Sequence, residues 1–417
     1  MVVMRGGTAA LALIVMCGCA GAPPIAPVAP RGLAVSCDDE LATLPDADPA
    51  VAPGAIVRCA RDVHGLRIAY RTTRSGDVPA IATARVIVPA SAHEGAPHVV
   101  VAHGTVGLAD ACAPSLAAPD ELVRAFASRG WPVIAPDYAG LGSAGVQGYG
   151  DNDDTARSVL DAARALATLL GERAPVVLAG HSQGGGAVLS AQSIARRYAG
   201  EDTAIAAVIA IAPGWPVRDR LETLRDPARR LRGGDELSAV VGAMFLYAWH
   251  ARAYGETRAG EGFPLASRDA LVHALERGCV GSLLTTVPRL APTLGALVDD
   301  ELRAALVACT DAGECDDRAR AILEWSRANV MRGDPEGAPI HVLQGDHDGI
   351  TTPARTRCIV DHLRASAIEP HVCVMDADHL SIVPRGVGHT IAIVESALRG
   401  DPAPGCANDA LPECVPE

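Results

Sequence analysis

The stretch VVLAGHSQGGGAVLS, residues 176–190, decides the fold. An apolar run typical of a buried strand ends at Ala179, the pentapeptide GHSQG follows at 180–184, and a helix-like run continues from there. In such a strand-to-helix turn the serine hydroxyl is exposed at the carboxyl end of the strand, and the glycines let neighbouring backbone approach. An ordinary glycine turn is the alternative. The flanking strand and helix favour Ser182 as a nucleophile, with a helix N-terminus that stabilises negative charge.

Stretches rich in valine and isoleucine recur along the chain and predict strands. They are residues 55–60, 66–72, 81–89, 98–102, 131–135, 175–179, 204–212, 339–343 and 371–375. The later ones alternate with helical patterns at 154–170, capped by Asp154 or Thr155, and at 185–198. This alternation predicts an α/β fold with a mostly parallel sheet and helices on both faces. The first strands are expected to form an antiparallel edge.

The alternation stops between about residues 214 and 335, where helical patterns occupy 236–251, 267–277 and 299–309. Because this segment lies between two sheet strands, it is expected to be an insertion that forms a helical cap or lid. Its aliphatic stretches, among them MFLY at 244–247 and residues 281–298, suit an acyl chain, although helix packing explains them equally well.

One enlarged α/β domain with an insertion fits a chain of 417 residues. The expected parts are a signal segment at 1–19, a Pro/Ala-rich linker at 20–36, a core made of 37–213 and 336–400, the cap at 214–335, and a polar tail at 401–417.

A nucleophilic serine needs a base and an orienting acid, and in this fold class they follow in the order serine, acid, histidine. The strand at 339–343 is followed by the loop QGDHDG, and the next strand by DADH. We expect Asp348 to be the acid, because it lies deeper in its loop than the alternative Asp346. We expect His379 to be the base, because it closely follows a strand, whereas the alternative His389 lies in or near the last helix.

The reaction also needs donors for a developing oxyanion. The backbone N–H of Gln183, directly after the serine, is one candidate. The second is expected from the loop HGTVG at 103–107, which follows the strand at 98–102, and we assign it to Thr105. A glycine-rich β-turn without this role is the alternative. His181 is expected to face away from Ser182 and to serve in packing or in support of the site.

Charge and composition exclude some classes of function. A net charge of −13 and a pI near 5.4 argue against nucleic acid, whose phosphates require a basic surface. Cysteine pairs with zinc-site spacing are absent from the sequence, so a zinc site is not expected, and no other metal site is predicted. The acidic run DNDD at 151–154 resembles part of a calcium loop, but it precedes a helix, and capping explains it better.

The N-terminus has the pattern of an export signal. Arg5 precedes an apolar core at 9–16 that is too short to span a bilayer, and CGC follows at 17–19. A small residue before Cys19 is typical of a bacterial lipoprotein signal, so membrane anchoring through a lipid on Cys19 is expected. Secretion or release to the periplasm without a lipid is the alternative.

Twelve cysteines fit an oxidising compartment, and ten remain when Cys17 and Cys19 are set aside. Sequence alone does not fix their pairing. Short-range pairing predicts Cys309 with Cys315, Cys358 with Cys373, and Cys406 with Cys414.

With these residues described, the chain resembles the α/β-hydrolase superfamily and, within it, the secretory lipase family. The resemblance rests on VVVAHGTVG at 99–107, CAPS at 112–115, DYAGLG at 137–142, SVLDAARA at 158–165 and GHSQGG at 180–185, together with 53–54, 70–72 and 86–89. It covers about residues 53–215 well and 339–382 more loosely. It implies hydrolysis of carboxylic esters without a cofactor, a triad of Ser182, Asp348 and His379, and an insertion that covers the acyl site.

The sequence therefore predicts an exported serine esterase or lipase acting on small or lipid esters. The same triad also serves acyltransferases and peptidases. A third hypothesis is a non-catalytic envelope lipoprotein that uses the fold to bind a ligand. The presence of all the expected catalytic residues argues against it.

Overall fold

The computed structural model describes residues 34–415, except 39, 42, 94, 201–202, 215–222, 232, 234–235 and 331. The predicted signal segment, Cys19 and most of the predicted linker lie outside the described residues. Within the described part, no helix combines the length and the apolar character that crossing a membrane requires.

The described residues form one sheet of nine strands in the order β1-β2-β3-β5-β4-β6-β7-β8-β9. The strands are β1 Ile56–Asp62, β2 Gly65–Arg74, β3 Val78–Ile87, β4 His98–Ala102, β5 Val133–Pro136, β6 Val176–His181, β7 Ile205–Ile211, β8 Ile340–Gly345 and β9 His371–Met375. Each of the nine predicted stretches overlaps one of them. Along the sheet, β5, β4, β6, β7, β8 and β9 each pair in parallel with the next. The pairs β1–β2, β2–β3 and β3–β5 are antiparallel, so the predicted antiparallel edge is confirmed.

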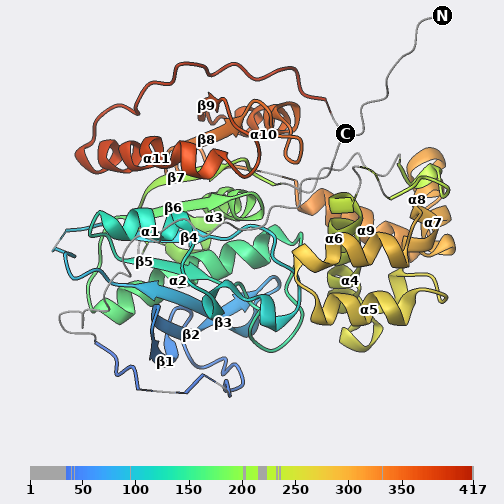
Figure 1. The fold of residues 1–417 in the computed structure, drawn as a ribbon, viewed down its shortest axis with the longest axis horizontal. Helices are drawn as coiled ribbons and strands as arrows, with labels where there is room; N and C mark the ends of the chain where they lie inside the picture. Colours follow the sequence, from blue (N-terminus) through green and yellow to red (C-terminus); the bar gives the residue numbers. More distant parts are fainter. Residues whose placement is uncertain are drawn as a thin grey trace, which may run out of the picture.

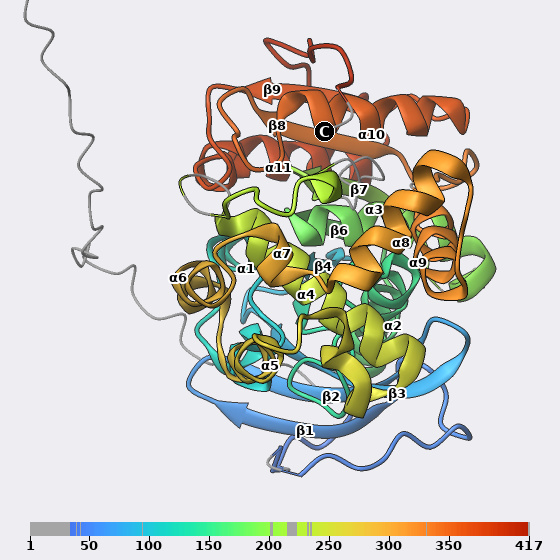
Figure 2. The same ribbon diagram turned by 90° about the vertical axis from the view of Figure 1, so that its right-hand side faces the viewer.

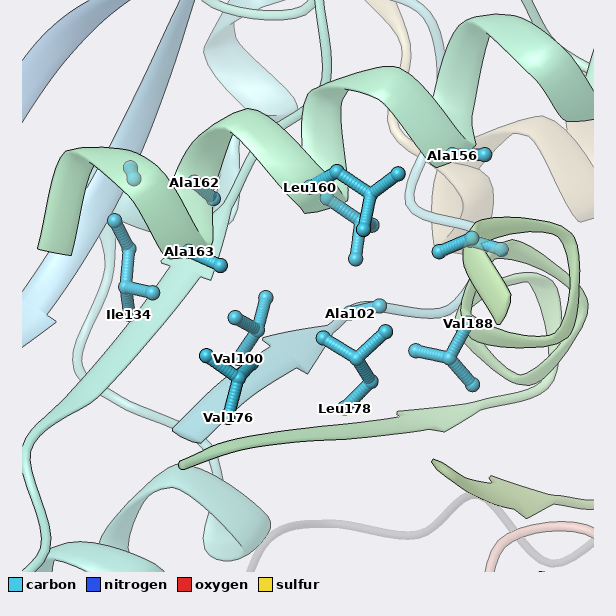
Figure 3. Close-up of a cluster of buried hydrophobic side chains, with 14 of the residues drawn as sticks. Val100, Ala102, Ile134, Ala156, Leu160, Ala162, Ala163, Val176, Leu178 and Val188 are labelled. Atoms are coloured by element: carbon cyan, nitrogen blue, oxygen red, sulfur yellow. The ribbon is translucent and has the colours of Figure 1, made fainter. Parts of the chain in front are cut away.

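Helices cover both faces of the sheet (Figure 1). The elements of the core are α1 Glu121–Ser128, α2 Asn152–Leu170, α3 Gln183–Ala199, α10 Pro353–Ala365 and α11 Ile382–Arg399, with short 3-10 turns η1 Asp110–Cys112 and η2 Pro114–Leu116. One buried cluster joins α2, α3 and α10 to the sheet, and a second joins α1 and α11 to the opposite face. Figure 3 shows the first cluster, in which Leu160 and Ala163 of α2 lie over Val100 and Leu178 of the strands. The predicted α/β fold with helices on both faces is therefore confirmed.

The start of α2 differs from the prediction. The helix begins at Asn152, and its cap is Asp151, whose side chain accepts a hydrogen bond from the N–H of Asp154. Asp154, which with Thr155 was one of two alternative predicted caps, is instead buried and forms a 3.0 Å ion pair with Arg74. Asp151 also pairs with Arg252 at 3.0 Å. Helix capping and ion pairs with arginine thus explain why Asp151 and Asp154 of the acidic run are present.

Further helices occur among the described residues between β7 and β8. They are α4 Glu236–Tyr254, η5 Glu256–Gly262, α5 Arg268–Arg277, α6 Val280–Leu290, α7 Leu294–Leu297, α8 Asp300–Ala312 and α9 Asp317–Ala328. They lie together beside the carboxyl ends of the strands and face the viewer in Figure 2. Their apolar side chains form a buried cluster of their own, which Leu108 and Tyr149 of the core join. The predicted helices at 236–251, 267–277 and 299–309 correspond to α4, α5 and α8.

Five disulfides link the ten cysteines of the described chain, and they correct two of the predicted pairs. Cys309 pairs with Cys315 as predicted, but Cys358 pairs with Cys414, and Cys373 pairs with Cys406. The remaining bridges are Cys37–Cys59 and Cys112–Cys279. The two predictions were wrong because the tail does not pair within itself. It runs along β9, where the N–H of Val374 donates to the carbonyl of Asn408 at 2.8 Å (Figure 1).

Candidate active site

Ser182 lies between the end of β6 and the start of α3, in the turn predicted from the pentapeptide. Its φ of 56° and ψ of −119° place a non-glycine residue in a region that L-residues rarely adopt. The turn is held on both sides, because the N–H of Ser182 donates to Ile211 and its carbonyl accepts from Gly214. Strain of this kind clusters at functional sites, where the surrounding structure maintains it.

The flanking glycines are required by close approach of backbone. A Cβ atom at Gly180 would lie 2.3 Å from the carbonyl oxygen of Gly184, and one at Gly184 would lie 1.9 Å from the carbonyl oxygen of Ala102. The loop after β4 also comes close, since a Cβ at Gly104 would lie 3.5 Å from the Cβ of Ser182. The turn that holds the serine is therefore packed directly against the loop that contains Thr105.

Asp348 and His379 lie in contact at the carboxyl ends of β8 and β9. The Nδ1–H of His379 donates to Oδ2 of Asp348 at 2.8 Å, and both side chains are buried. Asp348 also accepts from the N–H groups of Ile350 at 2.8 Å and Thr351 at 2.9 Å, and the Thr351 hydroxyl lies 2.9 Å from Oδ2. Burial opposes ionisation of this carboxyl, but the bonds from His379 and the loop outweigh it and hold its pKa below the usual 3.8.

The alternative acid and base do not take part in this contact. Asp346 is exposed, and its carboxylate accepts from the N–H of Ala377 at 3.1 Å. His389 lies within α11, where its Nε2 is 3.3 Å from Sγ of Cys406. The structure thus brings Asp348 and His379 together and leaves Asp346 and His389 elsewhere.

His181, expected to serve in packing or in support of the site, contacts the candidate base. Its Nε2–H donates to the backbone carbonyl of His379 at 2.7 Å, and the two rings lie 4.6 Å apart. Burial, reinforced by the neighbouring His379, lowers the pKa of His181 to about 4. No local sequence signal indicates this contact, because the two residues are 198 positions apart.

The candidate oxyanion donors lie on either side of the serine turn. Gln183 is the first residue of α3, so its N–H belongs to the first turn, whose donors have no partner within the helix. Thr105 lies in the loop after β4, and its hydroxyl is 2.9 Å from that of Tyr149. Burial raises the pKa of Tyr149 to about 12, so this phenol stays protonated. Tyr149 precedes α2 in a loop without a recognisable motif, so no sequence signal points to it.

The helices between β7 and β8 are tied to the Thr105 loop. Cys279, which caps α6, forms a disulfide with Cys112 and a β-bridge with Gly107. The N–H of Val280 donates to the carbonyl of Val106 at 2.7 Å. These links begin one residue after Thr105, so the same helical segment that lies beside the sheet also fixes one side of the site.

Two groups of potential metal ligands occur among the described residues. Asp346, His347 and Asp376 are exposed at the ends of β8 and β9, and Asp376 also pairs with Arg385. Cys373, His389 and Cys406 form the second group, but the two cysteines are joined in a disulfide and offer no thiolate. Neither group includes Ser182 or His379.

Comparison with known proteins identifies a family for one segment of the chain. Residues 111–220, about a quarter of the chain, match the model of the secretory lipase family. This segment contains the serine turn and much of the stretch on which the resemblance rests, and it confirms the resemblance. A search of curated proteins found no match.

Solved structures share the fold. Lipase A of Candida antarctica in its closed state matches with a TM-score of 0.67 at 18% identity, covering 91% of this chain and 90% of that one. A hydrolase of Legionella pneumophila, described as putative, gives a TM-score of 0.60 at 18% identity, with coverages of 81% and 89%. A single-residue mutant of the rice cell wall degrading esterase LipA of Xanthomonas oryzae gives 0.59 at 14% identity, with coverages of 81% and 91%. At these identities the likeness establishes the α/β-hydrolase fold.

Proposed function

We propose that this chain, an α/β-hydrolase with a segment matching the secretory lipase family, is an exported serine esterase that hydrolyses carboxylic esters. The observation that carries the proposal is the arrangement of three residues from separate parts of the chain. Ser182 occupies a strained turn at the end of β6, and His379 and Asp348 form a buried 2.8 Å pair at the ends of neighbouring strands. A nucleophile, a base and an orienting acid are the groups that acyl transfer to serine requires.

In the first half of the reaction, Oγ of Ser182 attacks the ester carbonyl carbon, and Nε2 of His379 accepts the hydroxyl proton. The carbonyl oxygen becomes an oxyanion, which the N–H groups of Gln183 and Thr105 stabilise. Collapse of this intermediate breaks the carbon–oxygen bond of the ester. His379 returns its proton to the departing alcohol, and an acyl-enzyme remains on Ser182.

In the second half, water takes the place of the alcohol. The water oxygen attacks the acyl carbon while His379 accepts a proton from the water. His379 then returns this proton to Oγ of Ser182 as the carboxylic acid product leaves. Asp348 stays ionised throughout, because its bonds to His379 and to the 350–351 backbone hold its pKa low. It fixes the Nδ1–H tautomer of His379 and stabilises the imidazolium that forms in each half.

The helices between β7 and β8 are proposed to form a cap that shapes the acyl site. Phe245 of α4 and Trp325 of α9 pack edge to face, and both approach Gly150, next to Tyr149. An apolar side of the cap therefore lies against the loop that supports Thr105. The apolar composition of the cap suits an ester with an apolar acyl group.

Export is supported by cysteine chemistry as well as by the N-terminal pattern. Five disulfides among the described residues fit an oxidising compartment. We propose that Cys19 carries a lipid and that the protein is anchored in the cell envelope. Expression of the full chain with radiolabelled palmitate tests this, with Cys19→Ser as the unlabelled control.

The decisive experiment compares the mature protein with its Ser182→Ala variant on nitrophenyl esters of increasing acyl length. Removal of the nucleophile is expected to lower kcat by about four to six orders of magnitude. A Ser182-dependent optimum at long chains identifies a lipase, and one at acetate or butyrate identifies a carboxylesterase. Equal activity in both folded proteins contradicts the proposal.

An acyltransferase or peptidase on the same residues is distinguished by product partition, with an added alcohol or amine competing against water. A non-catalytic envelope protein is distinguished by covalent labelling, since a serine-directed phosphonate would fail to label Ser182.

A further inference from the structure

We propose that His181 is a positioning residue for the base, which joins the strand carrying the nucleophile to the loop carrying His379. This inference rests on the proposed function, because it concerns the geometry of the same reaction. His181 is the last residue of β6, directly before Ser182. Its Nε2–H donates to the carbonyl of His379 at 2.7 Å.

The hydrogen bonds of the His379 imidazole ring are made by Nδ1. Nδ1 is held by Asp348 at 2.8 Å, which leaves Nε2 as the nitrogen that exchanges the proton with Ser182. The distance from that nitrogen to the serine depends on where the backbone of residue 379 lies relative to β6. Proton transfer requires hydrogen-bond reach between the two groups, so this backbone position matters for the rate.

Other bonds anchor the loop to elements different from β6. Ala377 is bonded to the β8 loop, because its N–H donates to Asp346 at 3.1 Å and its carbonyl accepts from His347 at 3.0 Å. Asp378 begins the turn into α11 by accepting from the N–H groups of Leu380 and Ser381. These bonds orient the loop toward β8 and α11. Among the described side chains, His181 supplies the hydrogen bond that orients it toward β6 and Ser182.

The chemical state of His181 suits this task. A backbone carbonyl only accepts, so the bond requires a proton on Nε2 of His181. Burial lowers the pKa of this imidazole to about 4, so it donates as a neutral ring near neutral pH. Its ring lies 4.6 Å from that of His379, which becomes positively charged during each half of the proposed reaction. A neutral donor holds the base without placing a second positive charge beside it, as lysine or arginine would.

The test measures kcat, KM and the rate of Ser182 phosphonylation in His181→Phe and His181→Gln. Phenylalanine keeps an aromatic ring without a donor, and glutamine supplies an N–H donor without a charge. We expect His181→Phe to lower kcat and the labelling rate about 10-fold to 100-fold, since a small misplacement of a catalytic group has effects of this size. KM is expected to change little. Glutamine is expected to restore most of the rate.

The matched control is His341→Phe, which removes another buried histidine whose pKa is lowered to about 4, on β8 beside His371. It is expected to leave kcat unchanged. Urea unfolding checks that each variant is folded, and His181→Ala serves as the donor-free variant if phenylalanine does not fit.

Three outcomes are decisive. Wild-type kcat in folded donor-free variants overturns the proposal. Equal losses in the phenylalanine and glutamine variants also overturn it, because packing alone then explains the residue. A wild-type protein that the phosphonate does not label, together with full activity of Ser182→Ala, overturns the proposed function itself and with it any role for His181.

Discussion

His379 and Asp348 are joined by a 2.8 Å hydrogen bond across 31 positions of sequence, whereas Asp346, two residues from Asp348, is exposed and bonds the loop backbone instead. Two aspartates of one loop thus occupy different environments. One is buried against an imidazole, and the other supports the loop from outside.

We predict that Asp348→Asn lowers kcat by about four orders of magnitude, because an amide no longer fixes the Nδ1–H tautomer or stabilises the imidazolium. Asp346→Asn is the control, since its amide oxygen can still accept from Ala377. It is expected to change kcat by about twofold or less, as exposed substitutions usually do. Steady-state kinetics on one nitrophenyl ester compares the two, and a larger loss in the Asp346 variant would reassign the acid.

Tyr149→Phe removes the hydroxyl that lies 2.9 Å from that of Thr105. The Thr105 loop then loses one of its supports, and we expect kcat to fall by about tenfold while KM stays within about twofold. The control is Tyr70→Phe, which deletes a buried hydroxyl bonded to the carbonyl of Ser158 at 2.8 Å. That variant should lower the free energy of unfolding by about 1 kcal/mol without lowering kcat. Equal kinetics in both variants would remove Tyr149 from the support of the oxyanion donor.

Removal of the Cys112–Cys279 bridge by a double alanine substitution is expected to affect both stability and rate. The bridge closes a sequence separation of 167 residues, for which the chain-entropy model gives a loss of about 5 kcal/mol. It also ties α6 to the Thr105 loop, so kcat should fall even at temperatures where the variant is folded. The control is the Cys309–Cys315 bridge, whose separation is 6, and whose removal should cost less stability and leave kcat unchanged. Urea unfolding and kinetics at a low temperature separate the two effects.

His250 is expected to make the stability of the protein depend on pH. It is fully buried, its Nδ1–H donates to the carbonyl of Leu246 at 2.7 Å, and its Nε2 accepts from Arg318 at 3.0 Å. Both nitrogens are thus used by the neutral ring, and burial, with a contribution from Arg318, lowers its pKa from 6.5 to about 4. Between pH 6.5 and 4 the unfolded chain binds a proton at this residue and the folded chain does not, so falling pH favours unfolding.

The measurement compares wild type with His250→Met by urea unfolding at a series of pH values. The stability advantage of wild type should be complete above pH 6.5 and should shrink toward pH 4 by up to about 1.4 kcal/mol per pH unit. A difference that stays constant across this range would contradict the prediction. Other titrating groups cancel in this comparison, because both proteins share them.

Most of the sheet could be predicted from the sequence because β4 to β9 are short, largely apolar runs, and the helices between them have a different period. The serine turn could be predicted for a similar reason. The glycines at 180 and 184 are local marks of close backbone approach, and the loops that carry Asp348 and His379 follow recognisable strands.

Contacts between distant segments could not be predicted in this way. The bond from His181 to His379 and the hydroxyl pair of Thr105 and Tyr149 depend on how loops pack in three dimensions. The disulfides of the tail also depend on such packing. Short sequence separation favoured a bridge between Cys406 and Cys414, but the tail runs along β9, where Cys406 pairs with Cys373 and Cys414 pairs with Cys358 of α10. The N-terminal cap of α2 could not be located to the residue, because several acidic residues in a row can each cap a helix.

The path of the tail has a consequence for how this protein is produced. β9 is the last strand of the sheet, and Asn408 accepts a hydrogen bond from its Val374, between two bridges that fasten the tail to β9 and to α10. An uncovered strand at this position is a template on which a second chain can add. Without these two bridges the tail is held less firmly, and we expect an uncovered β9 to favour aggregation by pairing with further copies. Disulfide formation keeps the tail on β9, so a higher soluble yield is expected in an oxidising compartment than in a reducing one.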